Sequence, residues 1–148
     1  MATKKITPLT AATDVITQLR AKGFRITKLR QTLLELLFLS NSPLSVPEIL
    51  ANLKKKRLVV NKTSIYRELE FLLAEDLLGE VDFLDGSKRY ERHSHHHHHL
   101  VCSQCKHVTC IDACVDLSPF YSRASKLGFI VDKHVLEFFG RCSRCQRL

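Results

Sequence analysis

Residues 61–76 have the sequence NKTSIYRELEFLLAED, in which a polar first turn gives way to regularly spaced apolar positions. Asn61 is a residue type preferred at helix N-caps, because its side-chain oxygen accepts a hydrogen bond from an otherwise unpaired backbone N–H. Ile65, Leu69 and Leu72 then recur at the spacing of one helix face. The segment therefore predicts a helix whose first turn is exposed and whose later turns pack on a core.

The flanking elements place this helix in a domain. Two extended segments, 78–84 and 87–92, follow it and are joined by an Asp-Gly turn, which is typical of a β-hairpin. Three further helices are expected before it, at 11–22, at 28–39 after an N-cap at Thr27, and from a Ser45–Glu48 capping box to about Lys56. Helices followed by a hairpin are typical of a winged helix-turn-helix, in which 62–76 would be the DNA recognition helix.

Basic residues gather at this predicted helix. Between residues 54 and 67 there is no acidic side chain, and the positive ones are Lys54, Lys55, Lys56, Arg57, Lys62 and Arg67. Such a strip suits DNA phosphates, which give affinity without sequence information. Lys62, Thr63, Ser64 and Tyr66 are the candidates for contacts at base edges or thymine methyl groups. The alternatives are a solvated helix end for 54–57 and a packing role for Tyr66.

Composition limits the class of protein. The chain has 148 residues, a formal charge of +8 and 45% hydrophobic residues, which is an ordinary globular composition with a preference for polyanionic partners. No apolar run approaches the roughly 20 residues that span a bilayer, and the N-terminus has no apolar signal region. We therefore expect a cytoplasmic protein without a membrane partner, in which thiols bind metal rather than form disulfides.

Cysteine and histidine occur only in the second half. The first 92 residues contain neither, whereas eight His and six Cys follow. We therefore predict a DNA-binding domain at 1–86 and a metal-binding domain at 87–148. Two C-x2-C pairs, Cys102 with Cys105 and Cys142 with Cys145, can complete a tetrahedral thiolate shell, which suits a structural Zn²⁺. The alternatives are free thiols, disulfides or a redox pair.

Five consecutive histidines, 95–99, precede the first cysteine pair. On an extended strand His95, His97 and His99 would face one side, and His96 and His98 the other, so that the run could serve two metal sites. The candidate co-ligands are Glu91, His93, Cys110, Asp112, Cys114, Asp116 and His134. The alternatives are solvated histidines and, for Cys110, a small buried apolar residue.

The rest of the second half is expected to mix strands and a helix. Residues 108–111 and 129–139 have the pattern of strands, and 117–127 that of a helix. Leu136, Phe138 and Phe139 are candidates for a core or for a subunit interface. The whole chain is therefore predicted to be α+β, with a winged-helix domain and a smaller α/β domain.

Several motifs together resemble the ferric uptake regulator family of bacterial metal-dependent repressors. They are Gly23-Phe-Arg-Ile-Thr-Lys-Leu-Arg30, Thr63-Ser-Ile-Tyr-Arg67, Gly86-Ser-Lys-Arg-Tyr-Glu91, His97-His-His99-Leu-Val-Cys102-Ser-Gln-Cys105 and Cys142-Ser-Arg-Cys145. The resemblance covers nearly the whole chain. It implies a homodimer in which the α/β domain is the dimerisation domain, a double-stranded DNA operator, and neither enzymatic activity nor a small-molecule substrate.

The resemblance also assigns metal sites. It places the family's structural zinc on the four cysteines of the C-x2-C pairs, and its regulatory site on Glu91, His97, His99 and the position held by Cys110. A further site maps onto His96, His98 and His134. The sequence departs from the family in three places: residues 42–44 contain no His, Cys110 replaces a carboxylate, and Leu117 replaces another, for which Asp112 or Asp116 would have to substitute.

These departures bear on the regulatory metal. A thiolate with two imidazoles and one carboxylate favours Zn²⁺ over Fe²⁺ or Mn²⁺, which prefer more oxygen ligands. The sequence therefore predicts a zinc-uptake-type repressor with zinc as co-repressor. The alternatives are an iron-responsive or peroxide-sensing regulator of the same family, and a metal-buffering protein that does not bind DNA. A zinc enzyme is disfavoured because no HExxH, nucleotide loop or Ser-His-Asp pattern is present, and an RNA-binding module because stacking aromatics are sparse.

Overall fold

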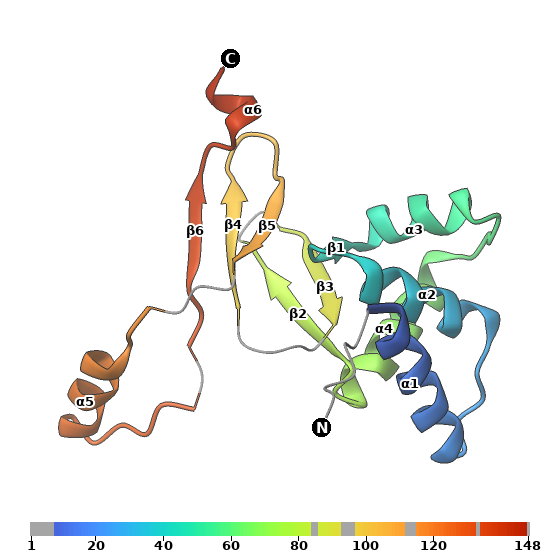
Figure 1. Ribbon diagram of the computed structural model, residues 1–148, viewed down its shortest axis with the longest axis horizontal. Helices are drawn as coiled ribbons and strands as arrows, with labels where there is room; N and C mark the ends of the chain where they lie inside the picture. The colour runs from blue at the N-terminus through green and yellow to red at the C-terminus, as the bar shows by residue number, and fades with distance from the viewer. Residues whose placement is uncertain (1–7, 84–85, 93–96, 112–114, 133, 148) are drawn as a thin grey trace, which may run out of the picture. The chain divides into compact units, whose positions relative to one another are not determined.

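The computed structural model describes residues 8–83, 86–92, 97–111, 115–132 and 134–147. The chain divides into two compact units, 1–94 and 95–148. The first unit therefore includes both strands of the hairpin, which the sequence boundary between residues 86 and 87 separates. Each unit is described by itself below (Figure 1).

The first unit contains four helices and a small sheet in its described part. The helices are α1 (Pro8–Ala21), α2 (Lys28–Leu39), α3 (Val46–Lys55) and α4 (Lys62–Ala74), and the strands are β1 (Leu44–Ser45), β2 (Leu78–Asp82) and β3 (Lys88–Arg92). Three helices begin where side chains can satisfy backbone groups. Thr27 accepts a hydrogen bond from the Arg30 N–H at 3.1 Å, and Asn61 accepts one from the Ser64 N–H at 2.7 Å. At the start of α3 the Ser45 N–H donates to the Glu48 carboxylate at 2.8 Å. These three predicted starts are confirmed.

Leucine and isoleucine side chains from α2, α3 and α4 form the core of this unit. Together with Leu19 of α1, the most deeply buried are Leu33, Leu34, Leu37, Ile49, Leu53, Ile65, Leu69 and Leu72, each 0–1% exposed. Burial of each such side chain contributes about 1.5–3 kcal/mol relative to exposure. Because α4 directs Ile65, Leu69 and Leu72 into this core, its opposite face is presented to solvent.

The sheet of the first unit has the order β1-β3-β2 and is antiparallel. The hairpin β2–β3 is the predicted one, with Leu78 paired to Arg92 and Asp82 to Lys88. The short strand β1 was not predicted, because two residues are too few to show the alternation of apolar and polar side chains that indicates a strand. It pairs with Tyr90 and Arg89 on the free side of β3 and thereby ties the hairpin to the start of α3.

The second unit is built on another three-stranded sheet. Its elements are β4 (His98–Cys102), β5 (Val108–Ile111), α5 (Ser118–Lys126), β6 (Glu137–Gly140) and α6 (Ser143–Gln146). The order is β5-β4-β6, with β5 antiparallel and β6 parallel to the central β4. Figure 1 shows α5 apart from the sheet and α6 directly beyond the end of β6.

The strand predicted at 129–139 is wrong over most of its length. Within the described residues, the observed strand covers Glu137–Gly140, where it pairs with His99–Cys102 of β4. Gly128 leaves α5 with a φ of +81°, and the next residues run exposed, with Ile130 91% exposed. A run of apolar residues suggested a buried strand, but no strand of the sheet pairs with it in the part of the chain that the structure describes.

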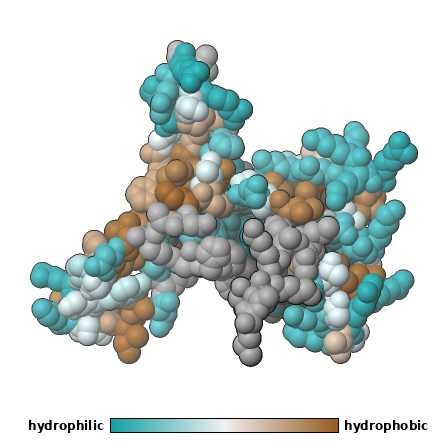
Figure 2. All heavy atoms as spheres, in the orientation of Figure 1, coloured by the Kyte–Doolittle hydropathy of each residue, from teal (hydrophilic) through white to brown (hydrophobic). Residues whose placement is uncertain are grey.

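Both units together confirm the α+β fold with an N-terminal winged helix and a C-terminal α/β domain. None of the described residues in α5 is buried, and Figure 2 shows apolar side chains at the surface around α5 and over the strands of the second unit. The helices that the structure describes include none long and apolar enough to cross a membrane.

Candidate functional site

Four thiols meet at one end of the second sheet. Cys102 ends β4, Cys105 lies in the turn that follows, Cys142 is the N-cap of α6, and Cys145 lies within α6. Their sulfur atoms all lie within 4.8 Å of one another, and the sulfurs of Cys105 and Cys142 are 3.7 Å apart. None of the four forms a disulfide. Strand pairing of β6 with β4 brings the two C-x2-C pairs together, although they are far apart in sequence.

Hydrogen bonds from backbone N–H groups favour the thiolate form at two of these cysteines, Cys102 and Cys142. The backbone N–H groups around Cys102, those of Cys105 and Cys142 first among them, lower the pKa of its thiol to about 5. The Cys142 N–H donates to the Cys102 sulfur at 3.4 Å. A backbone N–H of Cys145 likewise lowers the pKa of Cys142. Desolvation by burial raises the pKa of Cys145 to about 12. A cation would reverse that last effect, because a metal ion deprotonates a coordinating thiol.

The donor set and its geometry fit Zn²⁺. Four sulfurs at mutual separations below 4.8 Å agree with a tetrahedral site with zinc–sulfur bonds of about 2.3 Å. The shell leaves no position for a substrate, so such an ion is structural. It would join β4, β6 and α6 into one body.

A second cluster lies across β4 and β5. His99 pairs with Cys110 in the antiparallel ladder, so the two side chains share one face of the sheet. His97 lies against His99, with ring centres 4.9 Å apart. One ligand atom from each of the three residues lies within 4.8 Å of the others. His99 is 5% exposed, and the other two are half-buried.

Glu91, the remaining predicted ligand of the regulatory site, lies in the first unit. It is a half-buried residue of β3, opposite Gly79 of β2. A Cβ atom at Gly79 would lie 3.9 Å from Cγ of Glu91, which is an ordinary contact.

The opposite face of β4 carries His98, whose imidazole lies near that of His134 in the segment before β6. His98 is 2% exposed, and its ring centre lies 5.9 Å from that of His134. The Nδ1 atom of His134 is hydrogen-bonded to the hydroxyl of Tyr121 in α5, at 2.9 Å. Tyr121 was not among the predicted residues, although it lies one helical turn after Leu117 on the same face of the helix.

Other predicted ligands are not part of this pair. Asp116 accepts a hydrogen bond from the Ser118 N–H at 2.9 Å, and Ser118 lowers the pKa of its carboxyl group. Its carboxylate therefore stabilises the start of α5. The candidates that lie outside the described residues are His93, His95, His96, Asp112 and Cys114.

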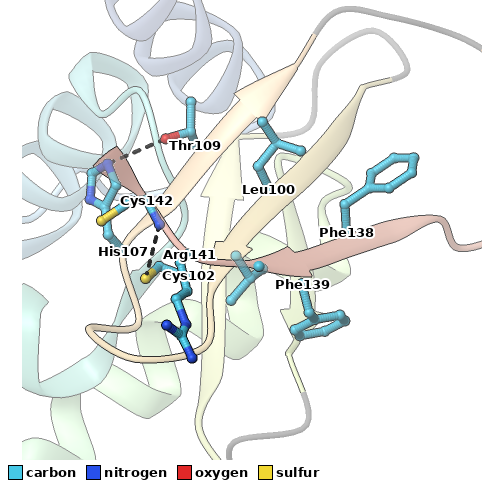
Figure 3. A pocket seen from close by; sticks show the side chains of 10 residues that line it. Leu100, Cys102, His107, Thr109, Phe138, Phe139, Arg141 and Cys142 are labelled. Carbon is cyan, nitrogen blue, oxygen red and sulfur yellow. Dashed lines mark hydrogen bonds between the residues drawn. The ribbon is translucent and has the colours of Figure 1, made fainter. Parts of the chain in front are cut away.

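A hollow of about 270 Å³ lies beside the four thiols. Figure 3 shows Leu100, Phe138, Arg141 and His107 along its sides, with a hydrogen bond of 3.2 Å between His107 and Thr109. Phe138 is 44% and Phe139 49% exposed, so neither is part of a core of this chain.

The predicted DNA-binding residues lie on the exposed side of α3 and α4. Lys62, Thr63, Tyr66 and Arg67 are exposed and Ser64 is half-buried, while Lys54, Lys55, Lys56 and Arg57 are exposed at the end of α3. The ammonium group of Lys62 lies 5.6 Å from the ring centre of Tyr66. Tyr66 is 39% exposed, and its position on α4 is next to Ile65, which faces the core.

A winged helix followed by an α/β unit with clustered thiols defines a class of metal-binding, helix-turn-helix proteins. The sequence profile of the ferric uptake regulator family matches residues 21–139. The chain therefore belongs to the ferric uptake regulator family, whose members are metal-responsive transcriptional regulators and not enzymes.

The names of individual relatives refer to different signals, namely peroxide, iron and zinc. The peroxide-responsive repressor PerR of Staphylococcus saprophyticus is 30% identical over 138 residues, covering 90% of each chain. The Helicobacter pylori regulator Fur, described with three functional metal-binding sites, superposes with a TM-score of 0.77 at 23% identity, covering 97% of both chains. A zinc uptake regulator in complex with zinc and DNA superposes with a TM-score of 0.65 at 22% identity, again covering 97% of both chains. The two structural likenesses support the fold.

Proposed function

We propose that this chain is a zinc-responsive repressor that binds operator DNA as a homodimer, with zinc at a regulatory site as co-repressor. The observation that carries the proposal is the pairing of Cys110 with His99, beside His97. This cluster offers one sulfur and two nitrogen atoms within 4.8 Å.

The chemistry of these donors supports zinc. A thiolate and imidazoles suit borderline and soft cations, whereas Fe²⁺ and Mn²⁺ prefer sites with more oxygen ligands. His99 is almost fully buried and lies in a strand that is paired on both sides. Two of the cluster's ligands, His99 and Cys110, are therefore held by paired strands, and a site with few ligands favours zinc over ions that require six.

We assign Glu91 as the carboxylate ligand of the regulatory site. It lies at the end of β3, and five residues, 92–96, connect it to His97. An extended chain covers up to about 3.3–3.6 Å per residue, so the connection permits Glu91 to reach the cluster. Because the division between the two units falls within this connection, ligation by Glu91 would couple the wing to the metal-binding domain.

Such coupling accounts for regulation. Bound metal supplies bonds that restrict the orientation of the winged-helix domain. In a two-fold dimer this orientation sets the separation of the two α4 helices, and only one separation fits successive major grooves. The metal then shifts a pre-existing equilibrium toward the DNA-binding arrangement.

For the DNA contacts we propose the exposed basic strip. Arg67, Lys62 and the residues 54–57 would bind phosphates, and Lys62, Thr63, Ser64 and Tyr66 would lie near base edges. The two domains would correspond to the units 1–94 and 95–148, so that both strands of the hairpin belong to the DNA-binding domain. Since the target is DNA and the metal ligands are thiols, we place the protein in the cytoplasm.

Operator binding as a function of free metal tests the proposal. The regulatory cluster is stripped with a mild chelator while the four-cysteine zinc is retained. DNA binding is then titrated with Zn²⁺, Fe²⁺, Mn²⁺ and Ni²⁺ at buffered free concentrations. We expect Zn²⁺ to restore binding at the lowest free concentration. A protein that binds the operator equally well with the cluster stripped would contradict the proposal.

Two variants sharpen this test. Cys110→Asp replaces sulfur by oxygen ligands and should shift the preference from Zn²⁺ toward Fe²⁺ and Mn²⁺. His107→Ala removes an exposed imidazole outside the cluster and should leave the metal preference unchanged.

A second candidate is a peroxide-sensing iron regulator, which the identity of 30% with a peroxide-responsive repressor favours. It predicts that Fe²⁺ restores operator binding and that hydrogen peroxide then abolishes it. Loss of binding with the iron-loaded but not with the zinc-loaded protein would select this candidate over the zinc-responsive repressor.

A further inference from the structure

We propose that Arg30 of α2 is a positioning residue of the DNA-reading helix α4, which it holds through the side chains of Glu68 and Phe71. The inference deepens the proposed function and rests on its assignment of α4 to the operator. Arg30 is not among the residues proposed to touch DNA. It would act by fixing the orientation of the helix that does.

The guanidinium group of Arg30 connects three segments of the first unit. Its Nε atom donates a hydrogen bond to the Glu68 carboxylate of α4. Its Nη1 atom donates to the carbonyl oxygen of Arg25, in the turn before α2, at 2.8 Å. The central carbon of the group lies 3.7 Å from the ring centre of Phe71, which is one turn further along α4. The planar fork of donors is thereby held by two hydrogen bonds and by a ring over its face, whereas a lysine offers only a point charge.

Arg30 reaches α4 from a backbone that is itself fixed. It lies in the first turn of α2, where its N–H donates to the side chain of the N-cap Thr27 at 3.1 Å. On the other side of the contact, Phe71 packs edge to face with Phe24, and the ring centres are 5.0 Å apart. The start of α2 and the middle of α4 are therefore joined by two neighbouring contacts.

The ion pair between Arg30 and Glu68 is shielded from water. The two side chains are 12% and 13% exposed, so dissolved salt screens their attraction only weakly. A second ion pair joins Lys22 to Glu75 at the C-cap of α4, at 2.8 Å, but the Lys22 side chain is 59% exposed. Exposed pairs of that kind contribute little. The pair with Arg30 is therefore the stronger of these two attachments of α4.

The pair restricts a motion that the apolar core leaves soft. Ile65, Leu69 and Leu72 hold α4 by burial, which is favourable but non-directional. A hydrogen-bonded ion pair has a preferred direction and so opposes rotation of the helix about its own axis. Such a rotation displaces exposed side chains such as Lys62 and Tyr66 more than the backbone, because they lie further from the axis. A binding contact needs its groups within about 0.5 Å of the productive geometry.

Charge alone predicts the opposite effect from positioning. Glu68 is an acidic residue that directly follows Arg67, a proposed phosphate ligand. Removing an acid from a DNA-binding helix should strengthen binding to phosphates through charge. Removing the group that holds Arg30 should instead weaken binding to the operator. The sign of the change in Glu68→Ala therefore separates the two effects.

Two DNA probes test the proposal with the full-length, zinc-loaded protein. One is the duplex that the parent protein selects from a random-sequence pool, and the other is a scrambled duplex of the same length and composition. We expect Glu68→Ala and Arg30→Lys to bind the selected duplex about 10-fold more weakly, which is in the lower part of the range for one base contact. Their affinity for the scrambled duplex should not fall. Glu75→Ala removes the same charge from the C-cap of α4, and as the matched control it should keep the parent ratio of the two affinities.

The ratio also separates positioning from general destabilisation. Loss of folded protein would lower both affinities equally, so an unchanged ratio in Glu68→Ala would overturn the proposal. Because Arg30→Lys and Glu68→Ala break one contact, the double variant should bind no more weakly than the more affected single variant. Additive losses would show that the two residues act independently and would overturn the pairing.

Residual dipolar couplings of backbone N–H groups test the positioning of α4 without DNA. We expect the orientation of α4 relative to α2 and α3 to change in Glu68→Ala and to be retained in Glu75→Ala. An unchanged orientation in Glu68→Ala would overturn the proposal, even if binding to the selected duplex fell. A parent protein that selects no duplex would contradict the proposed function, whereas the couplings would still show whether Arg30 orients α4. The two failures are therefore distinguishable.

Discussion

At the residue scale, the thiols of the four-cysteine cluster differ in how readily they ionise. Backbone N–H groups already lower the pKa of Cys102 to about 5, so part of the charge that zinc requires is present before metal binds. Cys145, with its pKa raised by burial to about 12, depends on the metal for its ionisation. A metal ion bound by these thiols would therefore couple its binding to folding.

We predict that Cys142→Ser loses the structural zinc and unfolds the region of β6 and α6. A tetrahedral site with three thiolates binds zinc more weakly, and its binding free energy is also folding free energy. Zinc content and thermal unfolding measure the effect. The control, Cys110→Ser, removes a thiol from outside the cluster and should retain the structural zinc. An intact fold and full zinc content in Cys142→Ser would show that the four cysteines do not form a structural site.

The stability of the first domain also depends on a single side chain, the N-cap of α4. Asn61 accepts the Ser64 N–H at 2.7 Å. Asn61→Ala leaves that donor to solvent and should destabilise the first domain by about 0.5–2 kcal/mol, measured by urea unfolding. Asn61→Asp keeps the acceptor and should lose less stability. Equal stability of Asn61→Ala and the parent protein would refute the role of the cap.

At the scale of elements, α4 packs on the core with one face and presents the residues proposed to contact DNA on the other. Its buried face anchors the helix, while Lys62, Tyr66 and Arg67 remain exposed. We predict that Lys62→Ala weakens operator binding and lowers the slope of log affinity against log salt by about one phosphate contact. Binding measured at several salt concentrations gives that slope. Lys126→Ala, a lysine of α5 in the other unit, is the control, and an unchanged slope in Lys62→Ala would remove Lys62 from the interface.

The sequence best predicts the elements that are determined by residues close together in the chain. The starts of α2, α3 and α4 follow from Thr27, Ser45 and Asn61, because a cap depends on a side chain and backbone groups three residues away. The extent of β6 depends instead on which strand lies beside it. The apolar residues 129–131 and 135–136 have the composition of a strand, but β4 pairs with 137–140.

The same distinction applies to the candidate sites. The spacing of the C-x2-C pairs is a local pattern, and the structure brings all four sulfurs together. The contact between Tyr121 and His134 joins a helix to a later segment. No motif marks such a contact, because a tyrosine on an exposed helix is an ordinary residue, and only the fold shows what its hydroxyl meets.

At the scale of the whole molecule, the second domain exposes large apolar side chains that a subunit interface would cover. Phe138 and Phe139 of β6 are 44% and 49% exposed, and Phe120 of α5 is 70% exposed. Exposed aromatic clusters of this kind mark protein–protein interfaces, which agrees with the homodimers of the family.

We predict that Phe139→Asp converts the dimer to a monomer, because a charge in an apolar interface is not compensated. Sedimentation velocity distinguishes the two states. Val59→Asp, at a position 88% exposed in the first unit, is the control and should remain dimeric. If Phe139→Asp sediments as a dimer, as the parent protein is expected to do, then Phe139 of β6 is not part of the interface.

In the proposed repressor, coupling between metal and DNA would be a property of the assembled dimer. When regulatory zinc raises operator affinity by some factor, thermodynamic linkage requires operator DNA to raise zinc affinity by the same factor. We therefore expect operator DNA to tighten zinc binding, measured with a competing chelator at fixed protein concentration. His97→Ala should abolish this effect while Ser122→Ala preserves it, since only His97 belongs to the cluster. Zinc affinity that is unchanged by saturating operator would mean that the two ligands bind independently. The metal would then have no route by which to control transcription.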